Sequence, residues 1–572
     1  MGWGVAGKHG AATAGLTLDT KEVGAHPLVQ PLLERLRVRE FLAQALGPTD
    51  PRAKLAAVDS ARLLVRNFVL SRHPLYEVPA WARRFAPDQL ELSAEQIALL
   101  NDDRLGRALD KLFVADRRTV MTRLVVHAVK EFRIALTRLH NDSTSITFSG
   151  LYRDPPPRPD ARRRLRIVHG HNKDHRPDLK QLVWTITVSG DGAVPVHYNA
   201  DDGNVTDDTT HIRTWQLLRE ISGRVDFLYV ADCKLCTRVN MGYIDAEGGR
   251  FITVLPGTRK EDGAFRQGLV DHAAPWQLIW ERAPQRRKDD PPERFEAVEG
   301  APSAEGYRIV WFRSSEKWKR DEQVRTQIIQ QARHELHRLR ERVGRRKLRT
   351  REQVEAAARE VLEETGTGRW LRVEVVATDK HAHKQAQPGR PGKHTRYVRT
   401  TTTIYEPVAM VDAEAVRASA VADGIFPLVT NQCTEQLSPL QLLQTYKYQA
   451  FIEKRHEQLK TAAEVVPVNY KSVERIEAFL FLYFVAVMIQ ALLERQVRMA
   501  MTTRKLQSIP LYPEDRACRA PTADKVIGLF EPVRRHVLFD QDRWLKTFWD
   551  PLNDVQRLVL ELLEVPASQY GQ

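Results

Sequence analysis

The chain has 572 residues, which is too many for a single hydrophobic core, so about three to five domains are expected. Hydrophobic residues make up 42% of the sequence and charged residues 28%, and this balance excludes a disordered chain. The net charge of +14 favours a polyanionic partner, with nucleic acid ahead of a membrane surface. A basic protein without such a partner is the alternative.

Cysteine usage and hydropathy narrow the class of protein further. Four cysteines are too few for a disulfide framework and indicate a reducing compartment. Cys233 and Cys236 form a CxxC without a second pair at zinc-ribbon spacing, so zinc or redox chemistry is not favoured. The N-terminal residues lack the apolar stretch of a signal peptide. Residues 476–493 are apolar, but they include Glu477 and Gln490, and a buried helix is favoured over a membrane span.

Residues 1–135 are predicted to be a helical N-terminal region. Helical periodicity covers 28–46, 51–70, 94–113 and 117–135. Frequent arginines favour a DNA-binding or dimerisation module, and a purely structural bundle is the alternative.

Between residues 136 and 260 the pattern changes to strands. Three are expected over 142–148, 182–188 and 194–198, with a hairpin turn at Ser189-Gly190-Asp191-Gly192. A helix (211–221), a strand (227–231), a helix (235–243) and a strand (251–255) follow. The hairpins favour antiparallel pairing and the helical crossovers favour parallel pairing, which is the order of an α/β, RNase H-like catalytic core with a mixed five-stranded sheet. Asp142 lies on the first strand and Asp232 follows the fourth; these strands are adjacent in this topology, so the two carboxylates could share metal ions.

Residues 261–420 are predicted to be an inserted α+β domain that interrupts this core. After a charged linker at 285–292, a long basic helix covers 317–343 and a second helix covers 352–364. Strands over 371–377 and 395–411 flank a basic loop. The basic helix is expected to contact phosphates, and a solvated charged helix is the alternative. His381 and His383 lack nearby Cys or acidic ligands, so a metal site there is not favoured.

Residues 421–500 are predicted to complete the core, followed by a helical C-terminal region over 501–572. An apolar strand at 423–431 leads to a helix at 437–461, for which Ser438, Pro439 and Gln441 suit the cap positions. At about 100° per residue, one narrow face of this helix carries Tyr446, Gln449, Glu453 and Lys460. A carboxylate beside cationic and hydroxyl groups suits a metal ion that holds a phosphate, whereas a surface helix with scattered polar residues is the alternative.

Several stretches resemble the DDE transposases of bacterial insertion sequences, and the likeness extends to about Pro521. They are DSTSITFSGLY, HNKDHRPDLKQLVW, DGNVTDDTTH, FLYVADCKLCT, DGIFPLVTN and YKYQAFIEKRHEQLK. Within these enzymes the chain looks like the IS-four-like superfamily, which has the signature Y-x2-R-x3-E-x6-K. Here the signature reads Tyr446, Gln449, Glu453 and Lys460, so Gln449 stands where the signature has Arg.

The resemblance implies that Asp142, Asp232 and Glu453 are the catalytic acidic triad and the metal ligands of a DNA transposase. The metal would be Mg²⁺, most simply two ions, with Mn²⁺ as a substitute. Tyr446, Gln449 and Lys460 would bind DNA phosphates. The resemblance further implies cleavage at element ends, strand transfer into target DNA, a homodimer on double-stranded DNA, and a location in the bacterial cytoplasm at the nucleoid, without a membrane. The inserted domain of related enzymes is mostly β, whereas the one predicted here begins with basic helices.

The segment 169–181 carries further candidates. Lys173, Arg176 and Lys180 are expected to contact the DNA backbone, and salt-bridge scaffolding with Asp174 and Asp178 is the alternative. A metal site of His169, His171 and His175 is not favoured.

Asp207 and Asp208 are expected to be helix-cap groups. Two other functions stay open: an RNase H-like nuclease without strand transfer, and an inactive, transposase-derived DNA-binding protein. The intact triad argues against the inactive protein.

Overall fold

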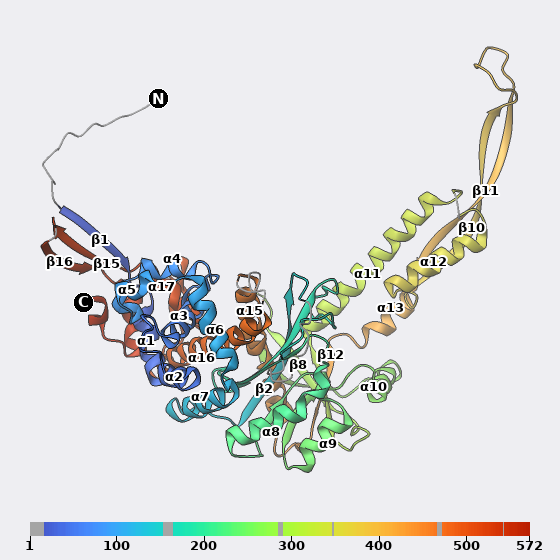
Figure 1. The fold of residues 1–572 in the computed structure, drawn as a ribbon. Coiled ribbons are helices and arrows are strands. Elements are labelled where there is room, and N and C mark those ends of the chain that lie inside the picture. The colour runs from blue at the N-terminus through green and yellow to red at the C-terminus, as the bar shows by residue number, and fades with distance from the viewer. Residues whose placement is uncertain (1–15, 153–163, 284–289, 346–347, 466–471, 542) are drawn as a thin grey trace. The chain divides into compact units, whose positions relative to one another are not determined.

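The computed structural model describes residues 16–152, 164–283, 290–345, 348–465, 472–541 and 543–572. The chain divides into two compact units, Met1–Thr253 with Gln444–Gln572 and Val254–Leu443. Every candidate site residue lies in the first unit (Figure 1). The N-terminal residues, where no signal peptide is expected, and most of the linker at 285–292 lie outside the described residues.

The N-terminal part of the first unit is helical, as its periodicity predicts. Its helices are α1 (His26–Arg35), α2 (Val38–Leu46), α3 (Ala57–Leu70), α4 (Val78–Arg84), α5 (Ala94–Ala98), α6 (Asp102–Val114) and α7 (Arg117–Glu131), with the 3₁₀ turn η1 (Pro87–Leu90). Side chains of Ser93, Asn101 and Asp116 cap α5, α6 and α7, respectively.

Five strands of the first unit form the expected mixed sheet, in the order β4-β3-β2-β5-β6. They are β2 (Arg138–Phe148), β3 (Lys180–Ser189), β4 (Pro195–Asp202), β5 (Leu228–Val230) and β6 (Arg250–Val254). β3 is antiparallel to β2 and β4, whereas β5 is parallel to β2 and β6. The helices α8 (His211–Ser222) and α9 (Arg238–Ala246) precede β5 and β6 and provide the crossovers that parallel pairing requires.

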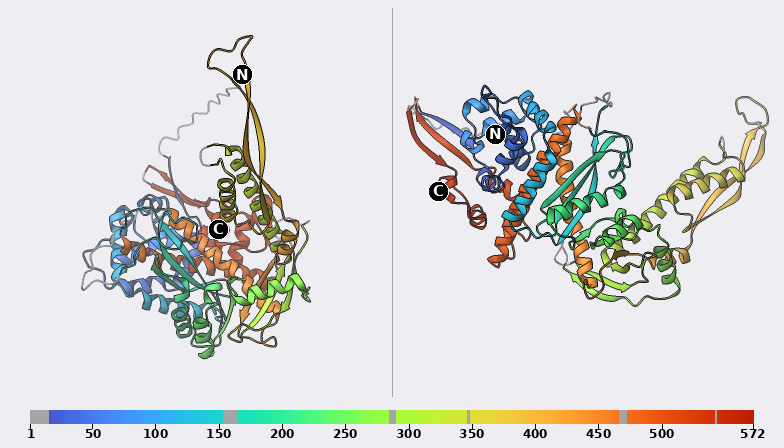
Figure 2. Two further views of the ribbon diagram at one scale, coloured as in Figure 1. Left: turned by 90° about the vertical axis from the view of Figure 1, so that its right-hand side faces the viewer. Right: turned by 60° about the horizontal axis from the view of Figure 1, so that its bottom comes forward.

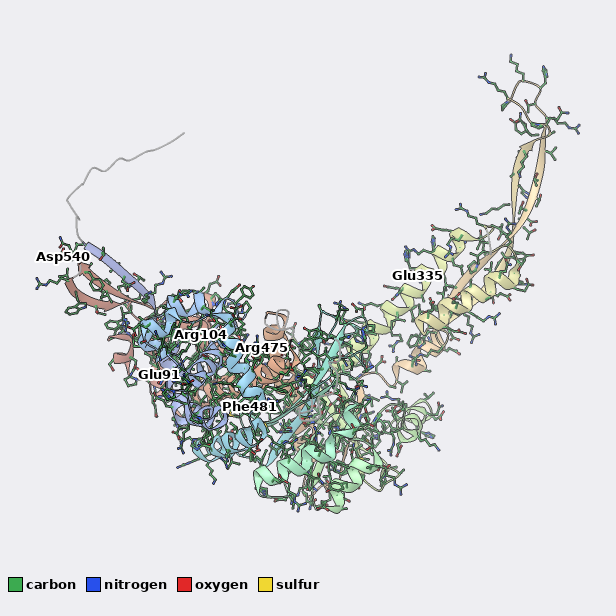
Figure 3. The ribbon with its side chains drawn as sticks, viewed as in Figure 1. Glu91, Arg104, Glu335, Arg475, Phe481 and Asp540 are labelled. Atoms are coloured by element: carbon green, nitrogen blue, oxygen red, sulfur yellow. The ribbon has the colours of Figure 1, made fainter. Side chains whose placement is uncertain are left out.

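The apolar helix α16 (Val473–Thr503) is the core of the first unit. It is long and apolar enough to cross a membrane, but 94% of its most apolar window is buried inside the protein. It packs against α3, α6, β4 and α18 (Asp554–Leu563), and the ring centroids of Phe479 and Phe68 are 4.8 Å apart. Phe481, which is labelled in Figure 3, lies on the same helix and is buried. Its Gln490 amide donates a hydrogen bond to the Val69 carbonyl at 2.9 Å, which satisfies a buried polar group. The predicted buried helix is confirmed.

The predicted helix over 437–461 is wrong in one respect, because the structure has two helices. They are α14 (Pro439–Lys447) and α15 (Gln449–Val465), with Tyr448 in a turn between them. The predicted capping box is confirmed: Ser438 N donates to Gln441 Oε1 at 3.0 Å, and Gln441 N donates to Ser438 Oγ at 3.3 Å. Tyr448 N–H bonds to the carbonyl three residues back, a 3₁₀-type bond. The sequence has neither glycine nor proline at this break. The helical periodicity of the sequence therefore continues across it and does not predict the interruption.

The C-terminal region is not simply helical, contrary to the sequence prediction. Besides α17 (Ala523–Phe530), α18 and the 3₁₀ turns η5 (Pro513–Asp515) and η6 (Ala567–Tyr570), it contains β13 (Ile509–Tyr512), β14 (Arg516–Cys518), β15 (Arg534–Asp540) and β16 (Arg543–Trp549). β15 pairs with β16 and also with the unpredicted β1 (Leu16–Glu22). The partners come from opposite ends of the chain, and no local pattern reveals such a pairing.

The second unit is α+β. Its helices are α10 (Lys260–Asp271), α11 (Ser315–Arg342), α12 (Arg351–Thr365) and α13 (Ala413–Ala420). Antiparallel strands in the order β12-β9-β8-β7 include three that the sequence did not predict, β7 (Gln277–Arg282), β8 (Glu293–Glu299) and β9 (Arg308–Ser314); β12 is Ile425–Thr430. A separate ribbon pairs β10 (Leu371–Gln385) with β11 (Tyr397–Val411). β10 continues beyond the predicted strand 371–377 as far as Gln385, so the first part of the expected basic loop is a strand.

Candidate active site

Two aspartates lie at the same level on neighbouring parallel strands. In the register of β2 and β5, His140 is opposite Val230. Asp142 and Asp232 each follow that pair by two residues, so the sheet places both carboxylates at one edge, as the sequence predicts. Asp232 stands where β5 gives way to the 3₁₀ turn η3 (Cys233–Leu235) and accepts a hydrogen bond from Lys234 N at 3.1 Å.

Glu453 lies on α15, which packs against β2. Burial, together with the negative charges of Asp142 and Glu457, raises the pKa of Glu453 above its ordinary value. Burial and repulsion from Asp142 likewise raise the pKa of Asp232 to about 6. The three predicted carboxylates are therefore brought within electrostatic range, since the charge on Asp142 acts on both of the others.

The pKa of Asp142 is shifted in the opposite direction. Burial by itself would raise the pKa of this carboxyl, but interaction with His456 and the charge of Lys173 outweigh it, and the pKa lies below its ordinary value. His456 Nε2 is 3.4 Å from Asp142 Oδ2. Of the three carboxyl groups, Asp142 is therefore the one whose pKa is lowered, whereas the pKa values of Asp232 and Glu453 are raised.

Tyr446 also belongs to this group, although it comes from α14 rather than α15. Burial and the negative charges of Asp232 and Asp142 raise the pKa of its phenol. The phenol thus keeps its proton at neutral pH and stays a hydrogen-bond donor.

Gln449 is turned into the protein. Its Oε1 lies 3.1 Å from His140 Nδ1, and its Nε2 donates to the Asn141 carbonyl at 3.3 Å. Burial lowers the pKa of His140 to about 4, so the imidazole is neutral at pH 7. Gln449 therefore joins α15 to β2, immediately before Asp142.

The predicted phosphate-binding cations are engaged within the protein. Lys460 pairs with Asp174, and Arg176 pairs with Asp178 at 2.7 Å. Lys180 donates to the carbonyls of Leu151 and Tyr152.

Lys173 is the one that reaches the carboxylate group. Its Nζ is 2.9 Å from Asp207 and donates to the carbonyl and hydroxyl oxygens of Ser143 at 2.7 and 2.6 Å. Its charge adds to the interaction with His456, and together they lower the pKa of Asp142 against the opposing effect of burial.

Two participants were not predicted. Asp207 lies in η2 (Asp207–Thr209) and makes no helix cap, so the cap prediction for Asp207 and Asp208 is wrong; Asp207 pairs with Lys173 instead. His456 was missed as well, although its spacing of three residues from Glu453 places it close to the same helix face. That spacing is the only local signal, since the partners of both residues come from distant segments.

The donor set fits a hard divalent cation. Three carboxylates supply the oxygen ligands that Mg²⁺ prefers, and a cation would relieve the repulsion that raises the pKa values of Asp232 and Glu453. Within the described ranges, no three His, Cys, Asp or Glu side chains already form a metal-binding group. Binding would therefore have to draw these carboxylates together. Among the described residues, Cys233 and the histidines of 169–175 and 381–383 belong to no such group.

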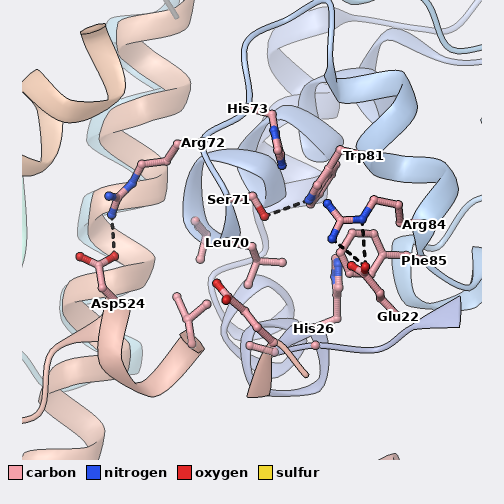
Figure 4. Close-up of a pocket in the computed structure, with 15 residues that line it drawn as sticks. Glu22, His26, Leu70, Ser71, Arg72, His73, Trp81, Arg84, Phe85 and Asp524 are labelled. Carbon is pink, nitrogen blue, oxygen red and sulfur yellow. Dashed lines mark hydrogen bonds and ion pairs between the residues drawn. The ribbon is translucent and has the colours of Figure 1, made fainter. Parts of the chain in front are cut away.

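A separate cavity of about 430 Å³ lies in the helical part of the first unit (Figure 4). Arg72 pairs with Asp524 across it at 2.7 Å, and Arg84 pairs with Glu22 at 2.6 Å. None of the three carboxylates lines this cavity, so it is not part of the candidate site.

The chain is similar to a protein-family model and to a solved structure. A family model described as a domain of unknown function (DUF4277) matches residues 18–126, within the helical N-terminal part. Comparison with curated proteins gives no match. Among solved structures, a cryo-EM structure of a piggyBac transposase synaptic complex with hairpin DNA is similar at 12% sequence identity and a TM-score of 0.25. That match covers 48% of this chain and 59% of the solved chain, and a TM-score of 0.25 does not establish a shared fold.

Proposed function

We propose that the chain is a DNA transposase of the DDE type with an RNase H-like core. The observation that carries the proposal is the register of β2 and β5, which sets Asp142 and Asp232 at one level, with Glu453 in electrostatic contact with Asp142. The strand order β4-β3-β2-β5-β6 and the signature on α14 and α15 support it. The reaction would be metal-dependent cleavage at the ends of an insertion sequence, followed by strand transfer into target DNA.

Asp142, Asp232 and Glu453 would hold the Mg²⁺ ions. When bound, these ions supply activation of a water or DNA 3′-hydroxyl nucleophile and stabilisation of the leaving oxygen in an in-line displacement at phosphorus. Asp142 is ionised at neutral pH, and Asp232, with a pKa of about 6, is mostly ionised there too. Both are therefore in the form that binds cations.

Other residues would hold the DNA beside this centre. The neutral phenol of Tyr446 would donate a hydrogen bond to a phosphate oxygen. Lys460 would act as a point charge once a phosphate competes with Asp174 for it. We assign Gln449 to holding α15 against β2, because its amide already bonds to His140 and Asn141.

The proposed partners are double-stranded DNA at the element ends and at the target, bound by a homodimer in the bacterial cytoplasm. The net charge of +14 supports a polyanionic partner.

The test uses purified full-length protein, Mg²⁺ and a supercoiled plasmid that carries the DNA flanking the gene. Asp142→Asn, Asp232→Asn and Glu453→Gln should each abolish cleavage while end binding persists. Glu95→Gln is the control, because it removes an exposed carboxylate of the same unit, on α5, and should keep activity. Normal cleavage by any triad variant would reject the assignment. Nicking without joined products would indicate a nuclease, and binding without nicking an inactive DNA-binding protein.

A further inference from the structure

The ribbon of β10 and β11 is supported at one end only. At its root, Leu371, Val375 and Ile404 are buried, and Val373 and Ala409 pack against a cluster centred on Leu336, Leu339 and Ala358. From residue 376 to residue 403 every side chain is exposed except those of Gln385 and Thr395, which are half-buried. In both views of Figure 2 the ribbon extends beyond α11 and α12. Two strands without an apolar face are only marginally stable alone in water. A bound partner would therefore stabilise this half of the ribbon.

The charge of this half is of one sign. Residues 380–405 contain six Lys or Arg residues and no Asp or Glu: Lys380, Lys384, Arg390, Lys393, Arg396 and Arg399. Lys380 lies 3.8 Å from Glu406, but in the described part of the chain no ion pair involves the other five. A cluster of uncompensated cations attracts a polyanion and repels a second copy of itself.

The two faces of the ribbon differ. In the antiparallel register, Lys384 is opposite Val398, on one face. On the other face His383 is opposite Arg399, and Gln385 is opposite Tyr397. This second face presents side chains that donate and accept hydrogen bonds, including the two types, Arg and Gln, that pair bidentately with guanine and adenine edges. The major groove of B-form DNA is about 12 Å wide and admits a two-stranded β-ribbon.

We infer that the distal half of this ribbon, residues 380–399, is a DNA-binding arm that enters the major groove of double-stranded DNA. The face with His383, Gln385 and Arg399 turns toward base edges, and Lys384 with the tip cations Arg390 and Lys393 contacts phosphates. The inference depends on the proposed function only for the choice of duplex DNA as the polyanion, and it requires no catalysis.

The first experiment measures binding of the full chain to a 30-base-pair duplex by fluorescence anisotropy across a salt series. The triple variant Lys384→Gln, Arg390→Gln, Lys393→Gln, which removes the three proposed phosphate contacts, should bind about tenfold more weakly at 0.15 M salt. Its log–log salt slope should be smaller by about 2 to 3, since each lost phosphate contact removes about 0.9. The matched control Lys260→Gln, Arg359→Gln, Arg417→Gln removes the same charge from exposed positions of the same unit and should bind as the unmodified protein does. Equal affinity and slope for the two triples would overturn the inference.

The second experiment identifies the groove by competition. Methyl green, a major-groove ligand, should displace the unmodified protein at lower concentration than it displaces the ribbon variant, and distamycin, a minor-groove ligand, should act equally on both. Selective competition by distamycin would overturn the inference, as would a changed oligomeric state of the ribbon variant in light scattering with unchanged DNA affinity. The ribbon-dependent difference in binding should persist in an Asp232→Asn background. Failure of the proposed catalysis is therefore seen separately from failure of the ribbon.

Discussion

Nε2 of His456 lies 3.4 Å from Oδ2 of Asp142, and the imidazole is almost completely buried. Neither ring nitrogen has a hydrogen-bond partner within the described structure. The ring therefore faces the Asp142 carboxylate, a candidate metal ligand, and it also acts electrostatically on Glu453. From this geometry we expect His456 to position the Asp142 carboxylate.

Replacement of His456 by Gln should shift the acid limb of the cleavage profile to higher pH. Interaction with His456 lowers the pKa of Asp142 against the opposing effect of burial, so its loss raises that pKa and leaves more of the carboxyl protonated in mild acid. The measurement is the cleavage rate between about pH 5 and 8. His197→Gln, which changes another buried histidine of the same unit, is the control. An unmoved acid limb in the His456 variant would remove its positioning role.

Replacement of Asp232 by Asn should stabilise the fold at neutral pH and not in acid. Burial and Asp142 raise the pKa of Asp232 to about 6 in the folded protein, from 3.8. A raised carboxyl pKa means that the folded state holds the proton more tightly, so stability falls as pH rises from about 4 through 6. The variant should gain about 1–2 kcal/mol at pH 7.5 and nothing at pH 4, after allowance for solvent screening.

Thermal unfolding of the Asp232→Asn variant between pH 4 and 7.5 measures this gain in stability. Asp191→Asn is a control of opposite sign, because hydrogen bonding to Arg495 outweighs burial and lowers the pKa of Asp191. That variant should lose stability at neutral pH. A gain for Asp232→Asn that is equal at pH 4 and 7.5 would contradict the electrostatic explanation.

Variants of the Lys460–Asp174 pair should change DNA binding in opposite directions. Lys460→Ala removes a cation and should weaken binding, with the larger loss at low salt, where electrostatic contacts are strongest. Asp174→Asn frees Lys460 from its ion pair and should tighten binding by about two- to fivefold. Anisotropy titrations at two salt concentrations separate these outcomes. Weaker binding by Asp174→Asn would show that the pair is scaffolding.

Replacement of Gln449 by Arg, the residue at this position of the signature Y-x2-R-x3-E-x6-K, should destabilise the protein. His140 Nδ1 lies 3.1 Å from Gln449 Oε1, and arginine has no acceptor to replace that oxygen. A buried donor left without a partner costs about 1–3 kcal/mol, measurable by urea unfolding. Gln449→Glu keeps an acceptor and is the matched control. If both variants unfold at the same urea concentration, the hydrogen bond is not what holds this position.

Much of the core could be predicted because its signals are local. Alternation of apolar residues and the Ser189–Gly192 turn specify the hairpins, and apolar runs joined by helical crossovers specify parallel pairing. These patterns placed Asp142 and Asp232 on neighbouring strands, and the capping box at Ser438 was visible in four consecutive residues. Such features need only near neighbours in the chain.

The contacts between distant segments could not be read from the sequence and depend on how the elements pack. The pairing of Lys173 with Asp207, the approach of His456 to Asp142 and the inward turn of Gln449 each join residues at least 34 positions apart. The same holds for the pairing of β1 with β15 at opposite ends of the chain. Sequence periodicity states which face of an element is apolar, but the partner of a polar group depends on which elements pack together. The carboxylates of the candidate site were therefore foreseeable, and their immediate electrostatic neighbours were not.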